Sequence, residues 1–130
     1  MSRKIVHVVG TGTIGEPLIG LLCDFKDELG IDEITFHKNT PLLLDKSKVT
    51  NLLKRGARLS TNREKFDNFL DIGLKPEFNT EEAIKRASVV IDCTPSGYGK
   101  ENKNKYYEKY LENTLGFVAQ GSEFGFGKMY

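Results

Sequence analysis

Apolar residues follow two different spacings along the chain, and each spacing predicts a type of secondary structure. Residues 5–9 and 88–94 are short runs rich in β-branched side chains, which is typical of strands buried on both faces. Between residues 14 and 29, apolar side chains recur every three or four positions, which predicts a helix that ends at Gly30. The apolar positions of this expected helix are Ile14, Leu18, Leu21, Leu22, Phe25 and Leu29.

The rest of the chain is expected to alternate between strands and helices. A second strand is expected at 33–38 with Ile34 and Phe36 inward, and Pro41 is expected to open a helix that Gly56 closes. The remaining expected elements are a strand at 57–60, a helix around 66–70, a weak extended segment at 74–78, a short helix capped by Thr80, a helix at 100–111 and a strand at 115–119. This alternation predicts a Rossmann-like α/β fold, a doubly wound and mainly parallel sheet flanked by helices, as one domain over residues 1–130.

The turn between the first strand and the first helix is rich in glycine. Its sequence is Gly10-Thr11-Gly12-Thr13-Ile14-Gly15, the G-x-G-x-x-G pattern in the order of strand, turn and helix that a dinucleotide pyrophosphate site requires. Gly10 allows a tight turn, Gly12 lets the backbone approach the phosphates, and Gly15 lets helix and strand pack closely. The helix N-terminus then offers N–H groups and the positive end of its dipole. An ordinary glycine-rich turn without a ligand is the alternative.

The end of the second strand bears on the choice of cofactor. Sites that prefer NAD usually carry an acidic residue there, but residues 36–40 contain none, and Asp32 and Glu33 lie at the opposite end of the strand. Lys38 would attract a 2′-phosphate and Asn39 or Thr40 could donate hydrogen bonds to it, which favours NADP or the use of both NADP and NAD. A solvent-exposed Lys38 without a ligand is the alternative.

A second candidate loop follows the strand at 88–94. Thr94 and Ser96 offer hydroxyl groups, and the two glycines of the loop, Gly97 and Gly99, permit close approach. Open α/β sheets bind ligands outside the carboxyl ends of their strands, so we expect this loop to contact the cofactor. A purely structural turn before the next helix is the alternative.

Charge and the remaining reactive side chains narrow the classes of function. Nineteen Lys and Arg against eighteen Asp and Glu give a net charge of +1, which argues against broad nucleic-acid binding. No apolar run approaches the roughly 20 residues of a membrane span and no signal peptide is visible, so we expect a cytoplasmic protein with no membrane partner. Cys23 and Cys93 are then expected to be reduced and buried, rather than joined in a disulfide. His7 is expected to be a core residue and His37 to lie near the adenosine, and no spacing typical of a metal site occurs.

Several motifs occur in order along the chain, and together they are more specific than any one of them. They are Gly-Thr-Gly-Thr-Ile-Gly at 10–15, Lys-Asn-Thr-Pro at 38–41, Val-Ile-Asp-Cys-Thr-Pro-Ser-Gly at 90–97, Lys-Asn at 103–104 and Gln-Gly-Ser-Glu at 120–123. This set resembles the archaeal-type glyceraldehyde-3-phosphate dehydrogenase family and implies the NAD(P)-binding half of such an enzyme. With the loops above, the expected cofactor-binding residues are Gly10, Gly12, Thr13, Ile14, Gly15, Lys38, Asn39, Thr94, Pro95, Ser96, Gly97, Gln120 and Gly121.

The chain also departs from the family pattern. Ser122 replaces a family glycine, and Cys93 stands where alanine is usual. The family's nucleophilic cysteine lies in a Ser-Cys-Asn-Thr-Thr stretch beyond residue 130, so the resemblance carries over no catalytic residue. Cys93 is a poor substitute because burial in a strand raises the pKa of a thiol.

We therefore expect this chain to bind the cofactor without turnover. The apolar, glycine-rich stretch at 116–130 suggests contact with a missing catalytic domain or with a second copy in a homo-oligomer. Two other hypotheses stay open: a stand-alone nucleotide-binding or redox-sensing module, and the cofactor domain of another aldehyde dehydrogenase, such as an aspartate-semialdehyde type.

Overall fold

The described strands form one parallel sheet. The computed structural model describes residues 4–11, 15–39, 41 and 43–93, and the backbone of residues 116–119. The strands are β1 (Ile5–Val9), β2 (Glu33–His37), β3 (Arg58–Thr61), β4 (Phe78–Asn79), β5 (Val89–Asp92) and β6 (Gly116–Ala119). They lie in the order β4-β3-β2-β1-β5-β6, and every neighbouring pair is parallel. The chain thus builds outward from β1 in one direction and then in the other, which confirms the doubly wound Rossmann-like fold.

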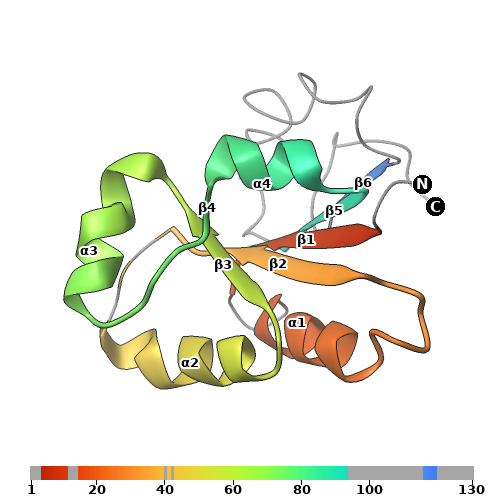
Figure 1. Cartoon of the computed structure of the whole chain (residues 1–130), viewed down its shortest axis with the longest axis horizontal. Helices are drawn as coiled ribbons and strands as arrows, with labels where there is room; N and C mark the ends of the chain where they lie inside the picture. Colours follow the sequence, from red (N-terminus) through yellow and green to blue (C-terminus); the bar gives the residue numbers. More distant parts are fainter. Residues whose placement is uncertain (1–3, 12–14, 40, 42, 94–115, 120–130) are drawn as a thin grey trace.

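Helices cover both faces of this sheet. The helical elements are α1 (Gly15–Asp24), η1 (Leu43–Asp45), α2 (Lys46–Lys54), η2 (Arg63–Lys65), α3 (Phe66–Asp71) and α4 (Thr80–Arg86). Figure 1 shows α1 and α2 together on one face and α4 on the other. Such two-sided cover is what a parallel sheet requires, because its strands are apolar on both faces. Within the described ranges, no helix combines the length and the apolar character that crossing a membrane requires.

The main apolar core lies between the sheet and the helices α1 and α2. Successive strands send alternate side chains to this face, and α3 adds one aromatic ring. Its buried members are Val8, Ile19, Ile34, Phe36, Val49, Leu52, Ala57, Leu59, Phe69 and Leu74. Each of the larger side chains contributes about 1.5–3 kcal/mol by leaving water. The inward placement expected for Ile34 and Phe36 is confirmed.

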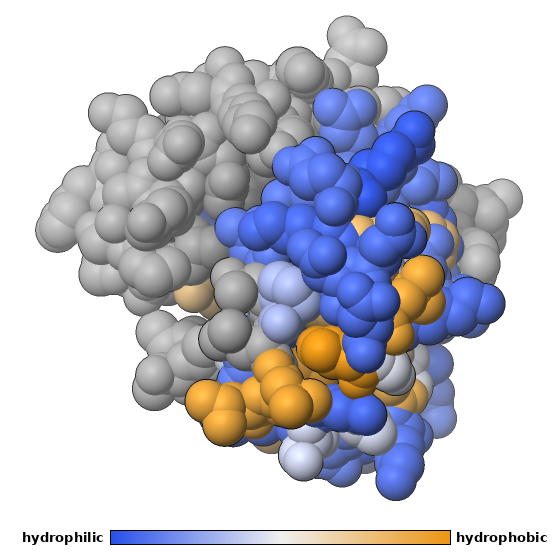
Figure 2. Space-filling model, turned by 90° about the vertical axis from the view of Figure 1, so that its left-hand side faces the viewer, coloured by the Kyte–Doolittle hydropathy of each residue, from blue (hydrophilic) through white to orange (hydrophobic). Residues whose placement is uncertain are grey.

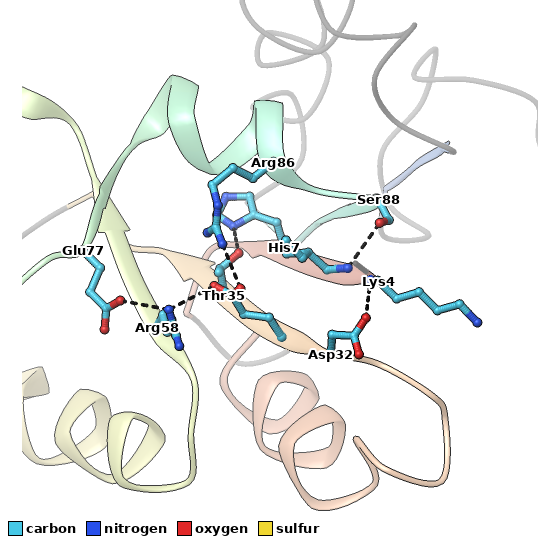
Figure 3. A network of polar contacts seen from close by, with 10 residues as sticks. Lys4, His7, Asp32, Thr35, Arg58, Glu77, Arg86 and Ser88 are labelled. Carbon is cyan, nitrogen blue, oxygen red and sulfur yellow. Dashed lines mark hydrogen bonds and ion pairs between the residues drawn. The ribbon is translucent and has the colours of Figure 1, made fainter. Parts of the chain in front are cut away.

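The opposite face of the central strands is polar as well as buried. His7 on β1 lies directly across from Thr35 on β2, and His7 Nδ1 is 2.7 Å from Thr35 Oγ1. His37 at the end of β2 lies across from Ser60 on β3, with 3.3 Å between Nδ1 and Oγ. Figure 3 shows the His7 ring on the side of α4, next to Arg86. His7 is thus the core residue that the sequence predicts.

The first helix is shorter than the apolar spacing predicts. α1 ends at Asp24, and turns continue the chain to Gly30, which has a φ of 69°. Leu21, Phe25 and Leu29 are 55%, 45% and 58% exposed, and Phe25 and Leu29 lie beyond the helix, whereas Leu18 and Leu22 of the expected stripe pack against the core. The core position of this helix is Ile19, which the expected stripe omits. Hydrophobic spacing identifies a helix face, but it does not reveal whether another element covers that face.

The second helix does not begin at Pro41. The short η1 comes first, and α2 begins at Lys46 with Asp45 as its N-cap. Leu43 and Leu44 of η1 are 68% and 91% exposed. Figure 2 shows a group of apolar side chains in the lower part of the face turned towards the viewer. Pro41 fixes only its own φ, which is not enough to start the helix there.

The start of α4 also differs from the prediction by one residue. Asn79, not Thr80, is the N-cap, because its side chain accepts a hydrogen bond from the Glu82 N–H while the Glu82 carboxylate accepts one from the Asn79 N–H. Thr80 is the first helical residue, and its hydroxyl donates to Asn62 Oδ1 over 2.6 Å. Either residue type can cap a helix, so only the geometry distinguishes them. The helix expected at 100–111 lies outside the described residues.

Candidate functional site

The carboxyl ends of β1, β2 and β5 meet at the glycine-rich turn. The Gly10 N–H donates to the carbonyl of His37 at the end of β2 over 3.1 Å. On the other side, the Cys93 N–H donates to the carbonyl of Val9 over 2.8 Å. Gly10 itself has a φ of 103°, a conformation that side chains disfavour. The turn therefore lies between β2 and β5, where the direction of strand order reverses and α/β sheets bind ligands.

The start of α1 lies against this turn with no space for a side chain. A Cβ added to Gly15 would lie 2.1 Å from the carbonyl oxygen of Gly10 and 3.6 Å from Cys93 Cβ. The nearer neighbour is backbone, which cannot rotate away, so position 15 accepts only glycine. Gly10 and Gly15 thus have the backbone roles that the sequence predicts for them.

Lys38 follows β2 and is buried at this edge of the sheet. Its N–H donates to the Ser60 carbonyl over 3.1 Å, which fixes the backbone, and only 6% of the residue is exposed. The Lys38 ammonium donates to Asp45 Oδ2 over 2.8 Å and lies 3.5 Å from Thr11 Oγ1 in the glycine-rich turn. The hypothesis of a solvent-exposed Lys38 is therefore wrong. Its cation lies between the turn and η1.

Asn39 continues from Lys38 and faces the loop after β3. Its Oδ1 accepts a hydrogen bond from Asn62 Nδ2, and its carbonyl accepts one from the Lys65 ammonium, both over 2.9 Å. Lys65 therefore adds a second cation close to the end of β2. The sequence does not predict Asp45 and Lys65 as neighbours of this site, because they lie in the separate short helices η1 and η2 and belong to no motif.

Acidic residues lie at the opposite end of β2, as the sequence predicts. Glu33 is buried and forms ion pairs with Arg86, at 2.8 Å, and with Arg58, at 3.6 Å. Arg58 also lies 3.4 Å from Glu77, and Asp32 accepts a hydrogen bond from the Lys4 N–H (Figure 3). This network ties β2 to β3 and α4 at the amino edge of the sheet. It lies at the edge of the sheet opposite the glycine-rich turn.

The histidines and cysteines of the chain lack the protonation states of active acid–base or nucleophilic groups. Burial lowers the pKa of His7 to about 3 and that of His37 to about 4, so both rings are neutral at pH 7. Cys23 and Cys93 form no disulfide with each other, and both are half-buried rather than fully buried as the sequence predicts. Burial raises the pKa of each, and the Asp92 carboxylate raises that of Cys93 further. Both cysteines therefore remain thiols near neutral pH.

The rest of the predicted site lies outside the described residues. This applies to Gly12, Thr13, Ile14, Thr94, Pro95, Ser96, Gly97, Gln120 and Gly121. Of the predicted positions, the structure brings together Gly10, Gly15, Lys38 and Asn39 at one edge of the sheet. Among the residues it describes, no group of three or more His, Cys, Asp or Glu side chains is placed to hold a metal ion.

Similarity to known proteins agrees with this geometry. No protein-family model matches the chain. It is 32% identical over 118 residues to a glyceraldehyde-3-phosphate dehydrogenase of Pyrobaculum islandicum, an alignment that covers 91% of this chain and 31% of that protein. The proteins of the same name from Methanobacterium bryantii and Sulfolobus acidocaldarius are 31% and 27% identical, over 92% and 95% of this chain and 33% of each relative. The chain is homologous to part of the archaeal glyceraldehyde-3-phosphate dehydrogenases. It spans about one third of the length of these glyceraldehyde-3-phosphate dehydrogenases.

Proposed function

We propose that the chain is the NAD(P)-binding part of an oxidoreductase similar to glyceraldehyde-3-phosphate dehydrogenase. Relatives of that name align with more than nine-tenths of the chain, and the parallel sheet has the strand order of dinucleotide-binding folds. The observation that carries the proposal is the approach of Gly15 to Gly10. This approach packs the N-terminus of α1 against the end of β1, as the third glycine of a dinucleotide-binding turn does.

The described residues fit such a cofactor in two places. α1 begins at Gly15, directly after the turn, so the positive end of its dipole favours the pyrophosphate. Lys38 lies beside Thr11 of the same turn and would attract a 2′-phosphate, which supports binding of NADP as well as NAD. When bound, the nicotinamide accepts or donates a hydride. The residues of this chain bind and orient it.

Binding without turnover is the second part of the proposal. Acyl transfer to a cysteine needs a thiolate, and the pKa of each of the chain's two thiols is raised by burial. Neither buried histidine is placed as a base for them, since the nearest partners of His7 and His37 are the hydroxyls of Thr35 and Ser60. The chain by itself therefore lacks the nucleophile that an aldehyde dehydrogenase of this type needs.

Isothermal titration of the chain with NADP and with NAD tests the proposal. We expect binding of at least one of them, and a loss of at least about tenfold in affinity for Gly15→Ala, because the new Cβ would push α1 off the turn. Gly30→Ala is the matched control. Gly30 has a φ of 69°, so alanine there is unfavourable by about 1 kcal/mol, but Gly30 lies just before β2 and away from the turn, so cofactor affinity should not change.

Two results would contradict the proposal. If the unmodified chain binds neither NADP nor NAD, the cofactor assignment is wrong. If the chain forms NADPH when it is given NADP and glyceraldehyde 3-phosphate, the claim that it lacks turnover is wrong.

A further inference from the structure

The Lys38 ammonium already has an anionic partner. It lies 2.8 Å from Asp45 Oδ2 in η1, and both side chains are largely shielded from solvent, with 7% of Lys38 and 29% of Asp45 exposed. Thr11 Oγ1, 3.5 Å away, is its other polar neighbour among the described residues. An ion pair with this little exposure is screened weakly by salt. The charge that would attract a 2′-phosphate is therefore balanced before any ligand arrives.

Asp45 does not serve its usual structural purpose at this position. It is the N-cap of α2, where an aspartate normally accepts a hydrogen bond from a backbone N–H of the first turn. Its side chain makes no such bond, and the backbone has a φ of −91° and a ψ of −4° in place of the extended conformation typical of an N-cap. The carboxylate is instead directed at Lys38. The Asp45 carboxylate thus gives α2 no capping hydrogen bond and is paired with Lys38 instead.

We propose that Asp45 sets the choice between NADP and NAD by competing for Lys38. This inference rests on the proposed cofactor site. A 2′-phosphate that approaches the Lys38 ammonium must share it with the Asp45 carboxylate and is repelled by that carboxylate, whereas the 2′-hydroxyl of NAD carries no charge. Lys38 alone favours NADP, and the Lys38–Asp45 pair cancels much of that preference. The unmodified chain therefore binds NADP and NAD with comparable affinity.

The test is isothermal titration of the full chain and its variants with NADP and with NAD. Asp45→Asn removes the carboxylate charge and keeps the shape, so we expect NADP to bind about tenfold more tightly, the effect of one partly screened charge at close range. Binding of NAD should change by less than about twofold. Lys38→Met should weaken NADP binding and leave NAD binding in place. Asp27→Asn, at an exposed position in the turn after α1, changes net charge equally and should alter neither affinity.

A readout that is independent of α2 separates charge from folding. Asp45→Asn leaves the buried Lys38 ammonium without its carboxylate, so its thermal midpoint should fall, and binding is compared at a temperature at which both chains are folded. Titration with adenosine 2′,5′-bisphosphate and with adenosine 5′-monophosphate should reproduce the selective gain for the ligand with the 2′-phosphate.

The outcomes distinguish the two proposals. If the chain binds neither NADP nor NAD, the cofactor site and the role of Asp45 are both wrong. If the chain binds both but Asp45→Asn changes NADP affinity no more than Asp27→Asn does, only the role of Asp45 is overturned. An equal gain for NADP and NAD would overturn it too, because a charge effect on the 2′-phosphate cannot strengthen a ligand that lacks one.

Discussion

Lowering the pH from 7.5 to 5 should destabilise the folded chain through His7 and His37, its only two histidines. Both rings are buried against the hydroxyls of the neighbouring strand, and burial lowers the pKa of His7 to about 3 and that of His37 to about 4. In the unfolded chain, a histidine has a pKa of about 6.5. As the pH falls below that value, the unfolded chain takes up two protons that the folded chain does not.

The sign and size of the effect follow from proton linkage. A group with a lower pKa in the folded state loses its contribution to stability as pH falls from its unfolded pKa towards its folded one. The loss therefore begins near pH 6.5 and continues to the folded values of about 3 and 4. At pH 5, each histidine should lower the free energy of unfolding by about 2 kcal/mol, and the two together by about 4 kcal/mol. That is a large part of the roughly 5–15 kcal/mol typical of a folded domain.

Urea denaturation followed by circular dichroism at pH 7.5 and at pH 5 measures this loss. The variants are His7→Asn, His37→Asn and the double variant, in which an amide nitrogen can replace Nδ1 opposite the hydroxyl of Thr35 or Ser60. Each single variant should lose about 2 kcal/mol less than the parent chain on acidification, and the double variant about 4 kcal/mol less. A double variant that loses as much stability as the parent would refute the reasoning, since carboxylates and not histidines would then cause the loss.

Two further predictions concern the amino edge of the sheet and the thiols. Glu33→Gln should lower the free energy of unfolding, measured by urea denaturation, by about 2 kcal/mol, because it leaves the partly buried Arg86 without its carboxylate. Glu77→Gln, the control at an exposed ion pair, should lower it by less than about 0.5 kcal/mol. Equal losses would contradict the burial of the Glu33–Arg86 pair. Cys23 and Cys93 should react slowly with iodoacetamide at pH 7, because burial raises the pKa of both thiols. Their reaction should become faster only when the pH rises above the pKa of an ordinary thiol. Mass spectrometry of the labelled chain measures this, the urea-unfolded chain is the control, and rapid labelling of either folded thiol at pH 7 would overturn the assignment.

The sequence predicts those features that depend on neighbours along the chain. The β-branched run of β1, the glycine turn and the apolar alternation of β2 are local patterns, and the structure has each of them. The position of Gly15 also follows, because a helix that begins directly after a tight turn must approach it closely.

Features that depend on what covers a residue could not be predicted in this way. The spacing of Leu21, Phe25 and Leu29 is helical, yet nothing among the described residues buries them. The partner of Lys38 is equally invisible in the sequence, because Asp45 lies in a separate short helix whose position depends on the packing of α2. The candidate site is therefore predictable in its backbone and not in its charges.

The two histidine–hydroxyl pairs also help to fix the register of the strands. His7 on β1 lies opposite Thr35 on β2, and His37 on β2 lies opposite Ser60 on β3. Each imidazole can therefore contact its hydroxyl partner only when the three strands are in this register. A slip of one residue would set His7 opposite Ile34 or Phe36, which cannot bond to a buried ring nitrogen. Valines and isoleucines tolerate such shifts because one apolar neighbour serves as well as another. During folding, these two histidine–hydroxyl pairs would therefore disfavour misaligned strand pairings that the apolar side chains alone would tolerate.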